Sequence, residues 1–377
     1  MVCSPAYNAD SETSMTNKRL LNVGMVGTGF IARAHSNAFR QTGFFFQIPY
    51  DIRLKVLCGR DRTKAEAAAA QWGWDEVETD WRKVVARKDI DAIDIATPNG
   101  LHAPIAMAAA QAGKMVLCEK PLAVSLQEAE TMAKAAHDVP NMVWFNYRRV
   151  PAVAFARQLL DEGRIGQVFH YRALYLNQSG NDPAKAGGWR YKKSEAGSGV
   201  MGDLLSHSVD EALYLNGPMT ELTALTQTFF PGRDVDDADL FLARFANGSI
   251  GTFEASRFGI GCWNRNSFEI NGAKGMLGFN LEDMNALEFT DATEVPNLRD
   301  RKKLMVTGPN QPYADVFWKP GHIIGYEHTF IATLGDFLQA VGNGKPFHPD
   351  FEDGVAVQRV LDAVERSAAS KNWVNIG

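Results

Sequence analysis

Lys120, Asp203 and His207 are residues of the types that move protons and stabilise negative charge. Asp203 and His207 stand four residues apart in the segment DLLSH, a spacing that places both side chains on one face of an α-helix. A carboxylate beside an imidazole suits a general base, because it orients the ring and stabilises the imidazolium. A surface Asp–His pair or a two-ligand metal site would show the same spacing. No third ligand follows at metal-site spacing, so we expect no metal.

Lys120 belongs to the tripeptide Glu119-Lys120-Pro121, which directly follows the apolar segment KMVLC. Pro121 has a fixed φ angle and restricts the preceding residue to extended backbone. The ammonium group at this position could hold a substrate oxygen and stabilise the negative charge that develops on it. The alternative is a lysine in an ordinary surface loop.

Residues 26–32 read VGTGFIA and lie between an apolar segment and a predicted helix. Gly27 permits a tight turn, and Gly29 lets a pyrophosphate approach the backbone at the N-terminus of the helix. In this strand–turn–helix context the pattern predicts a dinucleotide-binding turn, whereas alone it indicates only a glycine-rich corner. The residues expected to contact the dinucleotide here are Gly27, Gly29, Phe30 and Ile31.

The end of the second predicted strand should select between NAD and NADP. An acidic residue at this place binds the adenosine ribose of NAD, but this chain has Gly59 followed by Arg60. Arg60 could pair with the 2′-phosphate of NADP or stack on adenine, whereas Asp61 close by weakens the distinction. We expect Gly59 and Arg60 to bind a cofactor that is NAD or NADP, with NADP slightly favoured.

The first part of the chain must position these residues with a parallel sheet. Short apolar strands are predicted at 21–26, 53–58, 91–96, 114–118 and 142–146, and helical segments alternate with them. This alternation predicts a doubly wound parallel sheet of the Rossmann type, in which ligands bind beyond the carboxyl ends of the strands. Polar residues follow three of these strand ends, beginning at Thr97, Glu119 and Asn146.

The second part of the chain alternates apolar and polar residues in several strands, with a strong hairpin signal at Asn247-Gly248. We therefore expect an α/β protein with an N-terminal Rossmann domain and a C-terminal α+β domain containing a large, mainly antiparallel, open sheet. The expected divisions are a flexible extension at 1–19, a dinucleotide-binding domain at 20–147 and a substrate-binding and oligomerisation domain at 148–377. The last two helices are expected to pack back on the Rossmann domain.

Composition excludes several classes of partner. The chain has 377 residues and a net charge of −5, without a Lys/Arg-rich run, so we expect neither nucleic acid nor an anionic membrane as partner. Its four cysteines form no CxxC pair, which favours a reducing compartment. The polar N-terminus is typical of neither a signal peptide nor an anchor, and we expect a cytoplasmic protein.

The motifs together resemble the Gfo/Idh/MocA oxidoreductase family, which includes glucose–fructose oxidoreductase and inositol dehydrogenase. The resemblance covers residues 20–377 and rests on GTGFIA, TPNGLH, EKPLA and AGSGVMGDLLSH, in the family's order and spacing. The EKP and DxxxH segments are its specific elements. The stretches NYRRVPA and GWRYKKS make the chain most similar to inositol, levoglucosan and related sugar dehydrogenases. One departure is Gly197-Ser198-Gly199, where the family often has three glycines.

The resemblance implies hydride transfer between a secondary hydroxyl of a sugar, anhydrosugar or inositol and C4 of the nicotinamide. It implies that His207 is the general acid/base, that Lys120 orients the substrate oxygen and the cofactor, and that Asp203 completes the catalytic site. Asp203 is expected to hold His207 in orientation. The residues expected at the nicotinamide half of the cofactor are Thr97, Pro98, Asn99, His102, Glu119 and Lys120.

Substrate recognition should use hydrogen-bonding groups and an aromatic platform. A glycoside-cleaving enzyme that oxidises its sugar transiently, or a non-catalytic dinucleotide-binding regulator, could use the same scaffold. The open sheet of the second domain predicts a homodimer or homotetramer. Besides Lys120, Asp203 and His207, the candidate substrate-binding residues are Tyr147, Arg148, Asn177, Gln178, Trp189, Arg190, His322 and Tyr326.

Overall fold

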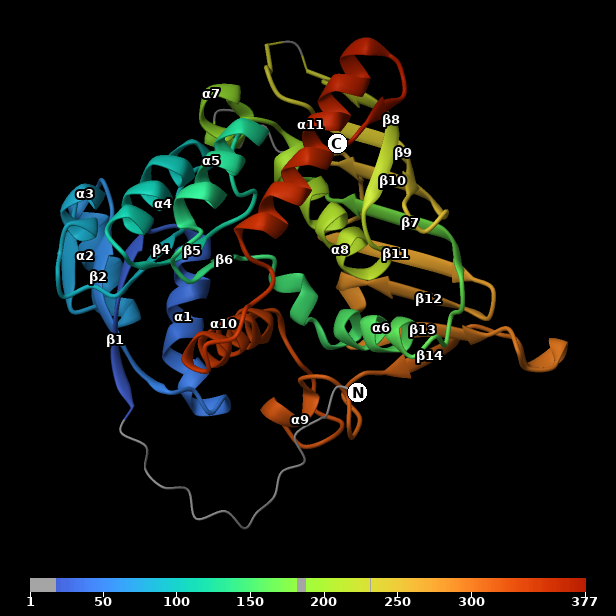
Figure 1. Cartoon of the computed structure of the whole chain (residues 1–377), viewed down its shortest axis with the longest axis horizontal. Helices are drawn as coiled ribbons and strands as arrows, with labels where there is room; N and C mark the ends of the chain where they lie inside the picture. Colours follow the sequence, from blue (N-terminus) through green and yellow to red (C-terminus); the bar gives the residue numbers. More distant parts are fainter. Residues whose placement is uncertain (1–17, 182–187, 231) are drawn as a thin grey trace.

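The computed structural model describes residues 18–181, 188–230 and 232–377, which fold around two β-sheets (Figure 1). The predicted flexible extension at 1–19 lies outside the described residues except for its last two positions. The first sheet has six parallel strands in the order β3-β2-β1-β4-β5-β6. Its strand order reverses between β1 and β4, which confirms the predicted doubly wound fold and places the ligand crevice at that point.

The helices of this domain begin where the sequence supplies caps. Asp61, Asp80 and Ser125 accept hydrogen bonds from backbone N–H groups at the starts of α2, α3 and α5. The elements are β1 (Arg19–Val26), α1 (Phe30–Phe45), β2 (Tyr50–Cys58), α2 (Arg62–Trp72), β3 (Glu76–Glu78), α3 (Trp81–Val85), β4 (Ala92–Ile95), α4 (His102–Gln111), β5 (Met115–Cys118), α5 (Leu126–Ala136) and β6 (Asn141–Val143).

The second sheet has nine strands in the order β14-β13-β12-β11-β7-β10-β9-β8-β15. Its neighbours pair antiparallel except β10 with β7, which confirms the mainly antiparallel sheet. The turn at Asn247-Gly248 joins β9 to β10, as predicted. The strands are β7 (Val168–Leu176), β8 (Met219–Gln227), β9 (Ala238–Phe245), β10 (Ile250–Ser256), β11 (Arg265–Gly272), β12 (Gly275–Asn280), β13 (Ala286–Asp291), β14 (Lys302–Met305) and β15 (Val374–Asn375).

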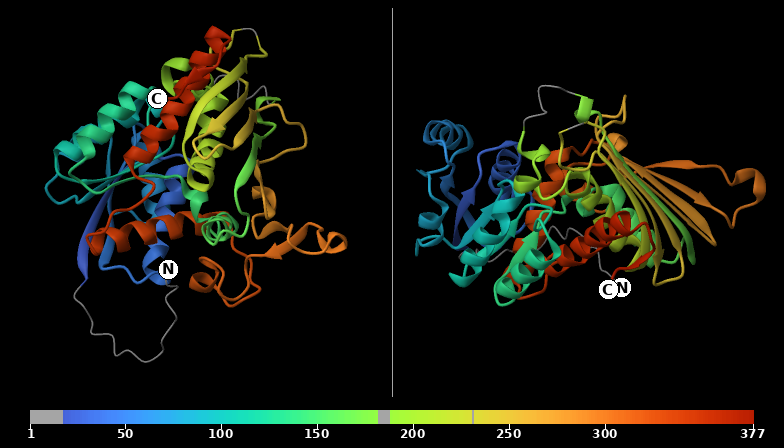
Figure 2. Two further views of the ribbon diagram at one scale, coloured as in Figure 1. Left: turned by 45° about the vertical axis from the view of Figure 1, so that its right-hand side comes forward. Right: turned by 90° about the horizontal axis from the view of Figure 1, so that it is seen from above.

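Helices cover one face of this sheet, as Figure 2 shows for α6, α8 and α11, and its other face carries alternating exposed side chains. Helix α10 packs against α1 of the first domain, and α11 packs against α5 as well as β8. The helices are α6 (Pro151–Asp161), α7 (Lys193–Ala196), α8 (Ser206–Asn216), α9 (Ala314–Phe317), α10 (Tyr326–Gly342) and α11 (Phe351–Ser370), with a π-helical turn at Met201–Leu205.

Among the described residues, no helix combines the length and apolar character that crossing a bilayer requires.

Candidate active site

The turn between β1 and α1 has the geometry that a phosphate-binding turn requires. Gly27 has φ +134°, and a Cβ atom there would lie 2.2 Å from the carbonyl oxygen of Ala96, so only glycine fits. At Gly29, the N-cap of α1, a Cβ would meet no atom within 4 Å. This N-terminus has neither a side-chain cap nor an acidic residue in its first turn. The N-terminus of the helix therefore offers uncapped N–H groups beside the open space at Gly29, and the turn fits the pyrophosphate of a dinucleotide.

The end of β2 is closely packed around Gly59. A Cβ there would lie 2.6 Å from Cγ2 of Thr28, so a larger residue requires the Thr28 side chain to move. Asp61 is engaged as the N-cap of α2, where it accepts a hydrogen bond of 3.1 Å from the N–H of Lys64. That hydrogen bond lowers the pKa of Asp61. Arg60 is exposed beside it and remains the basic group at this edge of the sheet.

The loops that follow β4 and β5 are tied together by buried polar contacts. His102 is fully buried, and its ring nitrogens lie 2.9 Å from the carbonyl oxygen of Pro121 and 3.1 Å from that of Thr97. Burial lowers the pKa of His102. Asn99 donates a hydrogen bond of 2.9 Å to the carbonyl of Ala196 in α7, which joins the carboxyl edge of the first sheet to the second domain.

The structure brings Lys120, Asp203 and His207 together at this edge. Nζ of Lys120 donates to the backbone carbonyl of Asp203 at 2.7 Å and lies 3.6 Å from its carboxylate. Arg257 and Arg190 approach the same carboxylate at 3.2 Å and 3.7 Å. Although burial opposes ionisation, these three cations hold the pKa of Asp203 well below its usual range.

His207 is only 6% exposed and lies among aromatic rings. The ring of Tyr147 lies 4.4 Å from its imidazole, and the ring of Tyr175 lies 5.9 Å away. Burial, reinforced by the nearby charge of Lys120, lowers the pKa of His207 well below its usual value, and Asp203 opposes this shift only partly. The imidazole is therefore neutral at neutral pH and able to accept a proton.

The expected hydrogen bond between Asp203 and His207 is not formed among the described residues, because the local helix differs from the predicted one. Met201–Leu205 form a π-helical turn, and the α-helix begins only at Ser206. The wider turn removes the i, i+4 alignment on which the expectation depended. Asp203 therefore pairs with cations, and aromatic packing orients His207.

Close packing explains a glycine in the segment that precedes this turn. A Cβ on Gly199 would lie 1.8 Å from the carbonyl oxygen of Asp236, so this position must be glycine. The carboxylate of Asp236 accepts hydrogen bonds from the N–H groups of Gly199 and Met201 at 2.6 and 2.7 Å. The segment is thus held against the loop before β9.

Sequence reasoning missed three polar residues that the second sheet contributes. Arg257, 1% exposed, follows β10 and binds Asp203. Tyr175 of β7 lies with its hydroxyl 3.2 Å from that of Tyr147 and donates to Asn264 at 2.7 Å. A charged residue directly after a predicted strand was the available signal for Arg257, whereas nothing in the sequence joined Tyr175 to Asn264.

The other sequence-predicted residues divide into two groups. Tyr326 lies near the site, with its ring stacked on that of Phe30 at 6.3 Å. Burial is the main cause that raises the pKa of Tyr326, and the charges of Tyr147 and Glu119 add to it. Arg148 is directed elsewhere, because its guanidinium is buried against Asp210 at 2.6 Å and Asp353 at 3.1 Å.

The remaining predicted substrate residues lie at the rim or in turns. Trp189 is partly buried, with the guanidinium of the exposed Arg190 over its ring. The amide oxygens of Asn177 and Gln178 accept backbone hydrogen bonds from the following loops. His322 is exposed and contacts the carbonyl of Lys319.

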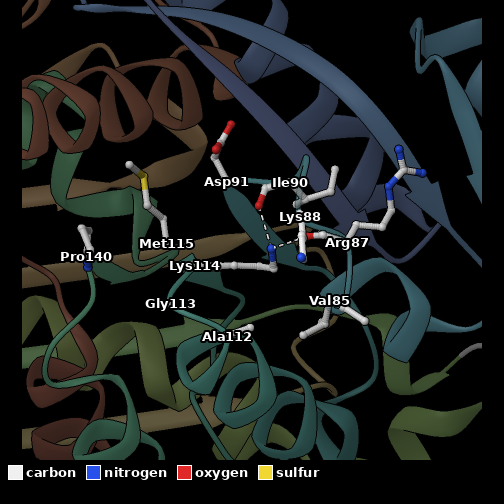
Figure 3. A pocket seen from close by; sticks show the side chains of 11 residues that line it. Val85, Arg87, Lys88, Ile90, Asp91, Ala112, Gly113, Lys114, Met115 and Pro140 are labelled. Atoms are coloured by element: carbon white, nitrogen blue, oxygen red, sulfur yellow. Dashed lines mark hydrogen bonds between the residues drawn. The ribbon is translucent and has the colours of Figure 1, made fainter.

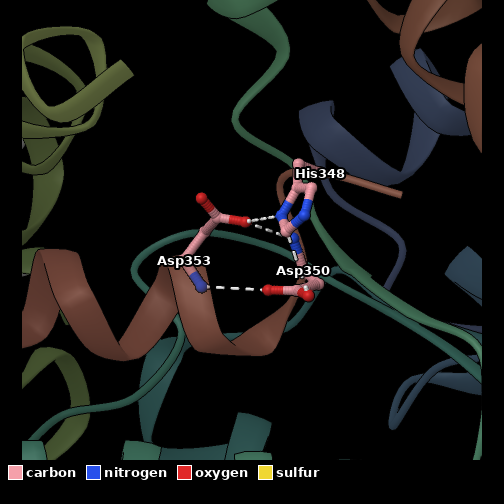
Figure 4. A group of neighbouring side chains, drawn as sticks. All are labelled: His348, Asp350 and Asp353. Atoms are coloured by element: carbon pink, nitrogen blue, oxygen red, sulfur yellow. Dashed lines mark hydrogen bonds and ion pairs between the residues drawn. The ribbon is translucent and has the colours of Figure 1, made fainter. Parts of the chain in front are cut away.

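Two other polar clusters lie apart from this site. In Figure 3, Lys114 before β5 extends into a hollow at the amino end of the first sheet, but its Nζ donates to the carbonyls of Arg87 and Ile90, both at 2.7 Å. In Figure 4, His348, Asp350 and Asp353 lie together at the start of α11, where Asp350 caps the helix. Both arrangements are accounted for by these structural contacts.

Comparison with known proteins supports the dinucleotide-binding fold of the first domain and the match of the second domain to the same family. Residues 21–147 match the GFO/IDH/MocA oxidoreductase family, described as having an NAD-binding Rossmann fold, and residues 153–278 match the GFO/IDH/MocA C-terminal domain. Levoglucosan dehydrogenase of Pseudarthrobacter phenanthrenivorans is 38% identical over 94% of this chain and 98% of its own. Inositol 2-dehydrogenase of Rhizobium meliloti is 26% identical over 94% and 98%.

Solved structures of similar proteins superpose on nearly the whole chain. A levoglucosan dehydrogenase in complex with NADH and levoglucosan superposes with a TM-score of 0.93 and 40% identity, covering 95% of this chain and 100% of its own. An oxidoreductase domain protein from Kribbella flavida superposes with a TM-score of 0.92 and 45% identity, with the same coverage.

Gly29→Ala should weaken binding of the dinucleotide without unfolding the chain. The added methyl group enters the open space above the N-terminus of α1, and the backbone angles at Gly29 suit alanine. We expect a Kd for the dinucleotide at least about tenfold higher by calorimetry, with an unchanged Tm. Gly43→Ala in the same helix is the control, since its Cβ makes only ordinary contact and should leave binding unaffected. Equal Kd values for the two variants would contradict the assignment.

Proposed function

Because this chain belongs to the GFO/IDH/MocA oxidoreductase family, we propose that it is an NAD-dependent dehydrogenase of sugars or polyols that acts on a secondary hydroxyl group. The observation that carries the proposal is the convergence of Lys120, Asp203 and a neutral His207 at the carboxyl edge of the first sheet. The levoglucosan dehydrogenases that resemble the whole chain favour an anhydrosugar or pyranose as substrate.

A bound nicotinamide would supply the acceptor for the hydride that leaves the oxidised carbon. His207 removes the hydroxyl proton from the same substrate, because its pKa is depressed and its ring is free of a positive charge. Lys120 donates a hydrogen bond to the hydroxyl oxygen and stabilises its partial alkoxide character. Asp203 fixes the ammonium of Lys120. Its carboxylate stays ionised, since its own pKa is lowered.

We infer that the aromatic residues around His207 exclude water and line the substrate site. Tyr147 and Tyr175 form a hydrogen-bonded pair beside the imidazole, and Asn264 extends this pair. Tyr326 adds an aromatic surface from α10, and the partly buried Trp189 and the exposed Arg190 form the rim. Such a site combines polar groups that can bind the hydroxyls of a sugar with aromatic rings that can contact its apolar faces.

His207→Ala should lower kcat for sugar oxidation by about 10²-fold or more, because proton transfer contributes that much in general-base catalysis. The wild-type kcat/KM should remain high below pH 6.5, since the pKa of His207 is lowered and the base stays unprotonated there.

Lys120→Met removes the cation near His207 and should move the acidic limb of the pH profile of kcat/KM to higher pH. Lys134→Met, an exposed lysine of α5, is the control with an unchanged limb. If the acidic limb of Lys120→Met stays where it is in the wild type, the charge of Lys120 does not lower the pKa of His207.

We propose NAD as the physiological cofactor, although Gly59 and Arg60 slightly favoured NADP. The family description and the NADH complexes of the similar dehydrogenases support this choice. We expect a higher kcat/KM with NAD than with NADP, and Arg60→Ala should change the NAD value little. A wild type that prefers NADP, together with loss of that activity in Arg60→Ala, would show instead that Arg60 binds a 2′-phosphate.

We also propose that two copies of the chain associate through the open face of the nine-stranded sheet. Leu225, Leu240, Leu242 and Ile250 are exposed there, by 43–63%, in a register that places them on one face. This face also carries the Arg244–Glu221 ion pair, so both charge signs are available for self-complementary contacts.

Leu242→Arg should dissociate this assembly, because an added charge at its centre would be buried without a partner. We expect the wild type to show the mass of a dimer or larger species by light scattering, and the variant to show a smaller mass. Leu298→Arg is the matched control, since Leu298 is 56% exposed and lies in the separate turn Pro296–Leu298. A monomeric wild type would disprove the proposed association.

A further inference from the structure

A buried histidine of α1 lies beneath the candidate active site and takes no part in the chemistry proposed above. His35 is fully buried. Its Nδ1 lies 2.8 Å from the carboxylate of Asp94 in β4, and its Nε2 lies 3.1 Å from the carboxylate of Glu119 after β5. The imidazole therefore bridges two acidic groups from neighbouring strands of the first sheet.

Both ring nitrogens face carboxylate oxygens, so both act as donors when the ring is protonated. Burial alone would lower the pKa of His35, but the charges and hydrogen bonds of Asp94 and Glu119 outweigh it and raise the pKa to about 9. The indole of Trp144 stacks on the imidazole at 4.0 Å and donates to the second oxygen of Asp94 at 2.8 Å. His35 is thus an imidazolium at neutral pH, enclosed on its open face by Trp144 and Phe330.

Glu119 connects this imidazolium to the candidate catalytic lysine. One carboxylate oxygen of Glu119 contacts His35, and the other accepts a hydrogen bond of 3.2 Å from the backbone N–H of Lys120. The N–H of Glu119 itself donates to Ile95 at 2.9 Å. The backbone from which the ammonium of Lys120 extends is therefore fixed from below by Glu119, while Asp203 fixes the ammonium end.

We propose that His35 is a positioning residue that holds the Glu119 carboxylate and, through it, the Lys120 backbone in the geometry required for hydride transfer. This inference rests on the function proposed above. Without the imidazolium, the buried Glu119 carboxylate would lose its counterion and would be free to turn away from Lys120. A buried ion pair of this kind is weak evidence for stability but well suited to specifying one conformation.

Two variants separate the contacts of His35. In His35→Gln the longer amide reaches toward Glu119, whereas in His35→Asn the shorter amide can donate only to Asp94. We expect kcat for sugar oxidation to fall by about 10- to 100-fold in His35→Asn with KM for the sugar little changed, and to fall less in His35→Gln. Thr42→Val, also buried in α1 and bonded only to the carbonyl of Ala38, controls for lost stability and should keep the wild-type kcat.

Fluorescence of Trp144 gives a readout that does not depend on turnover. A charged imidazole quenches an indole stacked on it, so wild-type emission should rise with a midpoint near pH 9, where His35 loses its proton. This transition should be missing from both Trp144→Phe and His35→Gln. No transition in the wild type would overturn the charged bridge on which the proposal depends.

The kinetic outcomes distinguish failure of the positioning role from failure of the proposed dehydrogenase function. If the wild type oxidises sugars but His35→Asn keeps its kcat, or if both His35 variants lose activity only in proportion to Thr42→Val, the positioning role is wrong and the dehydrogenase function stands. If the wild type reduces neither NAD nor NADP with any sugar or polyol, while the fluorescence transition is present, the proposed function fails and the positioning role fails with it.

Discussion

The ion pairing of the partly buried Asp203 carboxylate is the interaction on which the candidate site depends. It gathers Lys120 from the first domain, Arg257 from the end of β10 and Arg190 from the rim, so three separate segments meet at one negative charge. Lys120 and Arg257 are largely buried, so leaving either charge without its partner would be costly, and the pairing fixes how the two domains face each other here. This contact therefore concentrates charged groups at the carboxyl edge of the parallel sheet.

The same cations determine the state of His207. Because the Asp203 carboxylate is already paired, it does little to stabilise a protonated imidazole, and burial with Lys120 keeps the ring neutral. Aromatic packing by Tyr147 and Tyr175 replaces the carboxylate as the element that orients the ring. The site thus combines a neutral base with a fixed ammonium group, which is the pairing that removal of a hydroxyl proton requires.

Charges alternate in sign from the interior of the first sheet to the cavity. Asp94 is followed by His35, then Glu119, then Lys120 and finally Asp203 with its arginine partners. Each charge lies next to one of opposite sign, which is how ionisable groups remain charged in a buried environment. Glu119 meets Lys120 at its backbone N–H, so the charged layer below the candidate site is joined to the layer lining it through the backbone of Lys120.

The sequence by itself determined the parallel sheet and the glycine turn at Gly27 and Gly29, and it singled out Lys120 and His207 as candidates. These features arise from strand–helix periodicity and from residues within a few positions of each other, which local geometry controls. Only the tertiary structure decided that Asp203 pairs with Arg257, that Arg148 is buried away from the site, and that His35 supports Glu119. Those contacts join residues 54, 62 and 84 positions apart, and packing between elements sets them. The π-helical turn before His207 shows the same limit locally, since the α-helical spacing predicted an Asp–His pair that tertiary contacts of Asp203 replaced.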